Sequence, residues 1–186
     1  YQESGTRITW LRDKSIKSFL SDQGVIWQEF QRDGIIRGIK NRVNWDKNWY
    51  DTMSGSVIKN RYSENEQDFG TFPFQLPNGL ATSLKNYPDR FQKAGEYYAW
   101  RYLHSFCEGR GANYGRHISK PLESRKSCGR ISPYLAWGNL SVKQAVHYVK
   151  FNPNYENQKR SFNGLLTRLK WRCHFIQKFE VECAYE

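Results

Sequence analysis

Two different patterns of apolar and polar positions mark the first 55 residues. Apolar side chains recur every three to four residues over residues 9–23, which predicts an amphipathic helix that Gly24 ends. Residues 25–30 then have the composition of a short strand, and after an Asp-Gly turn residues 35–39 return as a strand or a short helix. A helix followed by a strand is half of an α/β unit, and a lone strand needs neighbours. The pattern therefore predicts that residues 1–55 are the C-terminal part of a truncated α/β domain.

The next part of the chain changes from helical to linker composition. Residues 44–53 predict a helix in which Trp45 and Trp49, four positions apart, share one face. Glycine, serine, asparagine and proline then become frequent, with scattered aromatic residues among them. We therefore expect residues 56–86 to link two domains.

From residue 87 the pattern is helical to the end, which predicts a mainly α fold for the second domain. Gly109 is expected to end the first of these helices, and residues 111–132 are expected to form a structured, basic loop. The remaining expected elements are a helix from Asp89, a short helix with Ser132 at its N-cap and Pro133 at N1, a helix over 142–151 capped by Ser141, and a long helix from about Ser161 onward.

The charge is concentrated in that second half. The 186 residues carry a formal net charge of +11, of which residues 107–186 contribute +8. Such a field favours a polyphosphate partner, either a nucleic-acid backbone or a phosphate-bearing cofactor, although a solvated basic face is the simpler alternative.

Composition excludes several classes of protein. Aromatic residues make up 16% of the chain, which is too many for a disordered basic tail. No apolar run approaches the roughly 20 residues of a membrane span. The four cysteines are too few for a disulfide framework and lack the spacing of a zinc site, so no metal is expected. We expect a cytoplasmic protein that does not enter a membrane.

Residues 127–135, Ser-Cys-Gly-Arg-Ile-Ser-Pro-Tyr-Leu, form the first candidate site. They combine a hydroxyl, a glycine that allows close backbone approach, an arginine and a helix start. Exposed N–H groups beside an arginine suit an anion such as a diphosphate. The alternative is an ordinary basic loop before a well-capped helix.

A second candidate site lies on the long C-terminal helix. Arg168, Trp171, Arg172 and Phe175 fall at positions i, i+3, i+4 and i+7, so they form one stripe of cations and aromatic rings. Such a stripe can clamp phosphates and stack on a flat ring. The alternative is an amphipathic helix with a core tryptophan and arginines whose heads reach solvent. His174, beside the stripe, is either a proton donor or a polar surface histidine.

These two segments together resemble the FAD-binding region of the photolyase/cryptochrome family. In that family a tyrosine precedes a Thr-Ser-Arg-Leu-Ser-Pro-Tyr-Leu-like stretch and a Gly-x-Leu-Ser helix start, and a helix with Trp-Arg follows. Here Tyr114, residues 128–141 and the pair Trp171-Arg172 match in that order. Residues 12–37 are similar to the end of the family's α/β antenna domain.

The resemblance implies a fragment with two sets of site residues; it identifies neither a catalytic residue nor an antenna chromophore. Residues 87–186 would begin the all-helical FAD-binding domain. The residues implied in FAD binding are Tyr114, Cys128, Gly129, Arg130, Ile131, Ser132, Leu165 and Arg172. The residues implied in binding UV-damaged DNA are Arg168, Trp171, Arg172, His174 and Phe175, with Trp171 stacking on a flipped-out lesion.

Two departures from the family pattern qualify the function that the resemblance implies. Cys128 and Gly129 replace the usual hydroxyl pair, and Arg168 stands where pyrimidine-dimer photolyases carry a glutamate. An arginine cannot accept a hydrogen bond from a base. The flavin-contacting residues that lie further along in the family are not in this sequence, so weak or absent FAD binding is expected.

Three hypotheses follow for the intact protein, which is expected to be a monomer. It is a carbon–carbon lyase of the photolyase type that repairs UV lesions by electron transfer from reduced FAD. Alternatively it is a cryptochrome-like blue-light photoreceptor, or a helical nucleic-acid-binding module without a cofactor.

Overall fold

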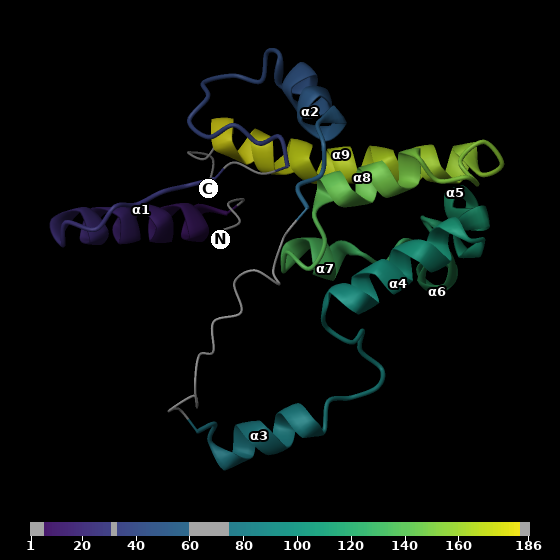
Figure 1. The fold of residues 1–186 in the computed structure, drawn as a ribbon, viewed down its shortest axis with the longest axis horizontal. Coiled ribbons are helices and arrows are strands. Elements are labelled where there is room, and N and C mark those ends of the chain that lie inside the picture. The colour runs from purple at the N-terminus through teal and green to yellow at the C-terminus, as the bar shows by residue number, and fades with distance from the viewer. Residues whose placement is uncertain (1–5, 31–32, 60–74, 183–186) are drawn as a thin grey trace.

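The computed structural model describes residues 6–30, 33–59 and 75–182, and over these residues the chain is mainly helical, as predicted (Figure 1). The longer helices are α1 (Arg7–Asp22), α2 (Trp45–Ser54), α3 (Asn78–Lys85), α4 (Glu96–Cys107), α8 (Val142–Lys150) and α9 (Lys159–Glu182). Four shorter elements complete the described chain: η2 (Arg110–Asn113), α5 (Tyr114–His117), α6 (Pro121–Ser127) and α7 (Ser132–Ala136). None of these described helices combines the length and apolar character that a membrane crossing requires.

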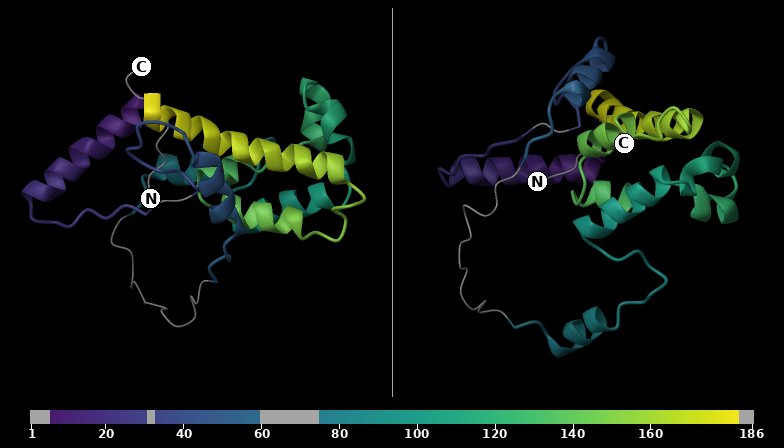
Figure 2. Two further views of the ribbon diagram at one scale, coloured as in Figure 1. Left: turned by 90° about the horizontal axis from the view of Figure 1, so that it is seen from above. Right: turned by 45° about the vertical axis from the view of Figure 1, so that its right-hand side comes forward.

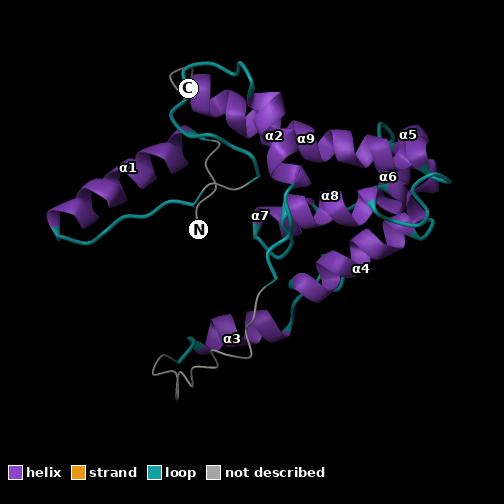
Figure 3. Ribbon diagram, turned by 45° about the horizontal axis from the view of Figure 1, so that its top comes forward, coloured by secondary structure: helices purple, strands orange, loops and turns teal. Residues whose placement is uncertain are grey.

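Residues 25–30 do not form the predicted strand, and residues 35–39 form neither a strand nor a short helix. The described part of residues 1–55 therefore does not support the expected truncated α/β portion. The backbone of residues 25–30 is without regular secondary structure, and the part of the chain that the structure describes contains helices and loops alone (Figure 3). A strand is stable only when a neighbouring strand takes up its backbone hydrogen bonds, and no such neighbour is described here. The preceding helix α1 does form, and a capping box between Thr6 and Thr9 fixes its start.

The core is built mainly from α4, α8 and α9. Leu103, Phe106, Val149 and Phe162 are fully buried, and α8 lies beside α9 in Figures 1 and 3. Each such side chain stabilises the fold by about 1.5–3 kcal/mol through apolar burial. Helix α2 contributes Trp45 and Trp49 to the core. Both are buried, and they lie on the shared face that the sequence predicted.

Helix boundaries agree with the predictions at some ends and differ at others. Ser141 caps α8 as predicted, in a capping box with Gln144. Ser132 is the first residue of α7 instead of its N-cap, which is Ile131, and no side chain caps that helix. Helix α4 begins at Glu96, seven residues after the predicted start, because Gly95 has a φ of 105°.

The expected linker, residues 56–86, lies partly outside the described residues. Within it the structure forms α3, none of whose residues is buried. This helix stands apart from the other helices in Figure 1 and in the right-hand view of Figure 2.

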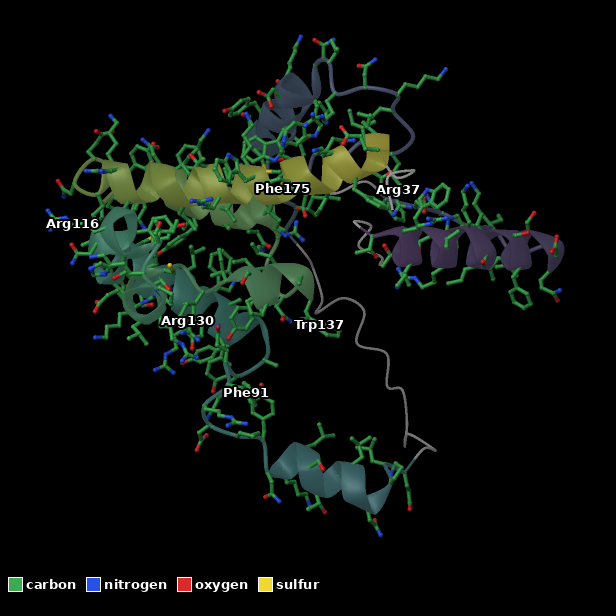
Figure 4. All side chains as sticks on the ribbon, turned by 180° about the vertical axis from the view of Figure 1, so that it is seen from behind. Arg37, Phe91, Arg116, Arg130, Trp137 and Phe175 are labelled. Atoms are coloured by element: carbon green, nitrogen blue, oxygen red, sulfur yellow. The ribbon has the colours of Figure 1, made fainter. Side chains whose placement is uncertain are left out.

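The segment before α2 is tied to the far end of α9. The side chain of Gln177, which is fully buried, bonds both backbone groups of Ile36: its Oε1 accepts from the N–H at 2.6 Å and its Nε2 donates to the carbonyl at 2.8 Å. Arg37, labelled near the end of α9 in Figure 4, pairs with Asp13 of α1 at 3.2 Å and with Glu29 at 2.8 Å. The N-terminal segments are therefore held to the helical core by polar contacts to α9.

We expect Gln177→Leu to lower the free energy of unfolding by about 1–3 kcal/mol, because it leaves both backbone groups of the half-buried Ile36 without their partners on α9. Urea unfolding followed by circular dichroism measures this change. Lys178→Leu, at the exposed neighbouring position, is the matched control and should change stability by less than about 0.5 kcal/mol. Equal midpoints for the two variants would contradict the prediction.

Candidate functional site

Two segments that are distant in the sequence from α9 meet on its first half. A Cβ atom added to Gly164 would lie 3.0 Å from the ring of Tyr114, so that ring lies directly on α9. A Cβ atom added to Gly129 would lie 3.2 Å from the side chain of Leu165. Arg168, one turn along α9, lies near enough for its positive charge to lower the pKa of Tyr114. Three residues that the resemblance assigned to one cofactor site, Tyr114, Gly129 and Leu165, therefore lie side by side.

We call this group of residues the cradle. It comprises Arg110, Tyr114, Cys128, Gly129, Arg130, Ile131, Leu165 and Arg168.

Arg110 shapes the turn at the centre of the cradle. Its guanidinium donates to the carbonyl of Cys128, to the carbonyl of Tyr102 at 2.8 Å, and to the carbonyl of Gly129 at 3.4 Å. Its Nε also donates to the hydroxyl of Ser105 at 2.9 Å. One side chain thus holds two consecutive carbonyls of the turn on the side of α4.

The backbone N–H groups of the same turn form an arrangement suited to an anion. Arg130 has a φ of 57°, and Ile131 follows with φ −95° and ψ −4°. A left-handed residue followed by a right-handed one makes successive N–H groups converge into an anion-binding concavity. Within the described residues, the backbone N–H groups of Gly129, Arg130 and Ile131 donate no hydrogen bond. Ser132, the last predicted residue of this stretch, is exposed at the start of α7.

The cradle also carries an excess of positive charge. Within the described chain, none of the guanidinium groups of Arg110, Arg130 and Arg168 pairs with a carboxylate. Arg130 donates to Gln92 at 3.1 Å, but its Nε is buried without a hydrogen bond partner among the described residues. A buried donor without an acceptor is costly, and an anion bound here would remove that cost.

The pKa values of the cradle residues reflect their burial and the positive charges around them. Burial lowers the pKa of the Arg110 guanidinium, and the charge of Arg130 lowers it further. Burial raises the pKa of Tyr114, while the charge of Arg168 opposes the rise. Burial likewise raises the pKa of the Cys128 thiol, and the charge of Arg110 opposes it. The Cys128 thiol is therefore neutral near pH 7, and the net charge of the cradle is that of its arginines.

Arg172 lies on α9 beyond the cradle and is engaged elsewhere. It forms an ion pair at 2.9 Å with Asp33, whose side chain is 5% exposed. The resemblance implies Arg172 in both FAD binding and DNA binding. The structure shows it holding the turn at residues 33–34 against α9. A buried carboxylate needs such a partner, because an unpaired one is strongly destabilising.

The exposed part of the predicted cation–aromatic stripe consists of Arg168, Trp171 and Phe175, because Arg172 is paired with Asp33. The guanidinium of Arg168 lies 4.4 Å from the centroid of the Trp171 ring. Trp171 is 46% exposed and Phe175, labelled in Figure 4, is 62% exposed. His174 differs, because it turns toward the segment before α2: Arg42 donates to its Nε2 at 3.0 Å, and the ring contacts Trp45. Trp171 and Phe175 are therefore available to a ligand, whereas His174 is partly occupied.

A groove of about 810 Å³ lies between α2, α8 and α9. We call it the aromatic groove, because rings supply much of its wall. Its lining residues are Asp46, Trp49, Tyr50, Val146, Lys150, Tyr155, Asn163, Leu166, Thr167, Lys170, Trp171, His174 and Phe175. No cradle residue lines it in the described chain, so α9 contributes different residues to the two places.

Several residues of the cradle and the groove are not marked by the sequence pattern. The pattern does not single out Arg110, and it places Gln92 only within the helix expected from Asp89. Tyr50 and Lys170 carry no local signal, because a groove between three helices depends on how those helices pack. A Cβ atom added to Gly111 would lie 2.7 Å from the Phe106 ring, so the glycine beside Arg110 allows that close approach.

Comparison of the chain with family models, with curated proteins and with solved structures finds no match in any of the three. Among the described residues no group of three or more histidine, cysteine, aspartate or glutamate side chains could hold a metal ion. The three described cysteines, Cys107, Cys128 and Cys173, are free thiols. The cradle and the stripe are therefore the features of the chain that indicate a function.

We expect the described thiols to resist alkylation at pH 8 in the order of their burial. Burial raises the pKa of Cys107 to about 12 and that of Cys173 to about 11. Since the thiolate is the reactive form, these two should react with iodoacetamide at least about 100-fold more slowly than a free thiol, and faster as the pH rises toward 11. Half-buried Cys128 should react first.

Peptide mapping by mass spectrometry after timed labelling measures the three rates. Labelling in urea is the control, because it should bring all three thiols to the same rate. Labelling of Cys107 as fast as Cys128 in the folded protein would be the opposite result.

Proposed function

We propose that this chain is the flavin-phosphate-binding part of a photolyase/cryptochrome-type flavoprotein that uses light and FAD to repair UV pyrimidine lesions in DNA. The observation that carries the proposal is the cradle. Tyr114, the turn at 128–131 and Leu165 come from three separate segments that lie together, and the resemblance implies all three in FAD binding. The same turn carries the backbone N–H groups of 129–131 and the Nε of Arg130, which have no hydrogen-bond partner among the described residues.

The donor groups of the cradle fit a diphosphate. A diphosphate presents several anionic oxygens, and here the backbone N–H groups at 129–131 and the Nε of Arg130 have no partner among the described residues. Gly129 and Gly164 allow the close packing of Leu165 and Tyr114, which a Cβ atom at either position would crowd. Arg172, paired with Asp33, would act by fixing α9 and not by touching the cofactor.

A bound reduced flavin would supply light absorption and the electron that splits the lesion. The residues of this chain would bind and orient. The cradle would fix the cofactor by its phosphates, and Trp171 would offer an exposed ring on which an extruded base stacks. Arg168, which stacks on Trp171, would bond a DNA phosphate or a base carbonyl but cannot accept from a base N–H.

The proposal also assigns the N-terminal residues to a domain. Residues 1–55 would be the tail of the antenna domain, with 56–86 as linker and 87–186 as the first helices of the FAD-binding domain. Within the described residues, the backbone N–H groups of 26–30 have no hydrogen bond acceptor, while Val25, Ile26 and Phe30 expose their side chains. An extended segment of this kind is what a neighbouring strand would pair with and cover.

One observation favours a second candidate, a cryptochrome-like photoreceptor. Pyrimidine-dimer photolyases carry a glutamate that accepts a hydrogen bond from the damaged base, and Arg168 at that position cannot accept one. A chain of this kind could therefore bind FAD without repairing DNA. Light-dependent turnover of DNA carrying cyclobutane or 6–4 lesions by the whole protein separates the two. Repair of either lesion excludes a sensor-only role.

Arg130→Ala tests the cradle in this chain. We expect it to weaken the binding of FAD, and of ADP as a shorter diphosphate probe, by about tenfold, the loss of one charged hydrogen bond of about 1.4 kcal/mol. Quenching of flavin fluorescence and calorimetry measure the two affinities. Arg101→Ala, on the exposed surface of α4, removes the same charge elsewhere and should change affinity less than twofold.

Equal losses in the two variants would mean that nucleotides are attracted by net charge alone. Absence of binding by both probes at millimolar concentration would remove the cradle as a diphosphate site. Circular dichroism of each variant shows whether the fold is kept.

A further inference from the structure

We propose that the aromatic groove between α2, α8 and α9 is a second ligand site, which takes a planar aromatic anion of mononucleotide size. No cradle residue lines the groove, whereas Trp171, His174 and Phe175, which the resemblance implies in DNA binding, do line it. The inference goes beyond the proposed function because the ligand is a free small molecule.

The walls of the groove are suited to a flat ring. Trp49 is buried in it, while Tyr50, Trp171 and Phe175 each expose about half of the side chain or more. Exposed aromatic rings in water are unfavourable unless something covers them. A ring stacked on such side chains gains about 1–3 kcal/mol per contact, whatever its hydrogen-bonding pattern.

The charges of the groove favour an anion. Lys170 is held inside it, with its Nζ 3.1 Å from the Asp46 carboxylate, 3.3 Å from the Tyr50 hydroxyl and 4.4 Å from the Tyr50 ring centroid. This lysine is therefore compensated by Asp46. Lys150 is exposed at the edge of α8 and forms no ion pair within the described residues. Lys150 leaves the lining with a net positive charge, and a phosphate or carboxylate at that end would neutralise it.

The dimensions set the size of the ligand. A volume of about 810 Å³ lies inside the range of roughly 300–1,000 Å³ that small-molecule sites occupy. The groove has polar groups at few points, since Asn163 and Thr167 are engaged with one another or with Tyr155. Recognition would thus come from stacking along the groove and from one charge at its Lys150 end.

The probe for this site is 2-aminopurine riboside 5′-monophosphate, whose fluorescence falls when the purine stacks on an aromatic ring. We expect quenching by the wild-type chain, at least a tenfold loss of affinity in Trp171→Ala and a three- to tenfold loss in Lys150→Ala. The neutral riboside should bind the wild type as weakly as the nucleotide binds Lys150→Ala, because both lack the same charge pair.

Two control variants keep the test specific. Lys143→Ala removes a lysine from the same helix that does not line the groove, and Arg130→Ala removes a cradle charge. Both should leave probe affinity within twofold of wild type. Loss of affinity in Arg130→Ala alone would place the probe in the cradle and overturn the proposal. Urea midpoints identify any variant whose fold has changed.

Two other outcomes would also overturn the proposal. Equal affinities for nucleotide and neutral riboside, with Lys150→Ala like Lys143→Ala, would show a non-specific apolar surface. Displacement of the probe by single-stranded (dT)8 at a concentration at least 100-fold lower than by the unlabelled mononucleotide would show that the occupant is a nucleic-acid strand. Failure of the groove test with intact FAD binding would leave the proposed function standing, since different variants report on each.

Discussion

The guanidinium of Arg110 is the contact on which the geometry of the cradle depends. It takes up the carbonyls of Tyr102, Cys128 and Gly129, so it joins α4 to the turn before α7. With both turn carbonyls bound on one side, the following N–H groups are left for a ligand. The left-handed conformation of Arg130, which costs roughly 1–2 kcal/mol, persists because these contacts hold it.

Helix α9 connects the cradle to the aromatic groove. Leu165 and Arg168 belong to the cradle, whereas Leu166 and Lys170 line the groove. Trp171 touches both, because it stacks under Arg168 and also lines the groove. A ligand that moves the Trp171 ring would therefore also move the cation that faces Tyr114. The two sites are separate in their lining but share this pair of side chains.

The sequence predicted the helices whose signals are local. Ser141 and Gln144 mark the start of α8, and the spacing of Trp45 and Trp49 marks the buried face of α2. The grouping of Tyr114 with the turn at 128–131 came from family resemblance. Contacts between distant segments, such as Arg172 with Asp33, left no local signal. The prediction of a strand at 25–30 was wrong, because composition shows only that a segment could form a strand. Forming one also requires a neighbouring strand to pair with.

The bond between Gln177 and Ile36 spans 141 positions of the chain. Because the ribosome makes Ile36 before Gln177, the turn at residues 33–37 has no contact with α9 until that helix has been synthesised. At about 5–20 residues per second that delay is of the order of ten seconds. Closing so large a loop is entropically costly as well, so this attachment is expected to form after the local helices. Newly made chains would thus expose α1 to chaperones and proteases until α9 has formed.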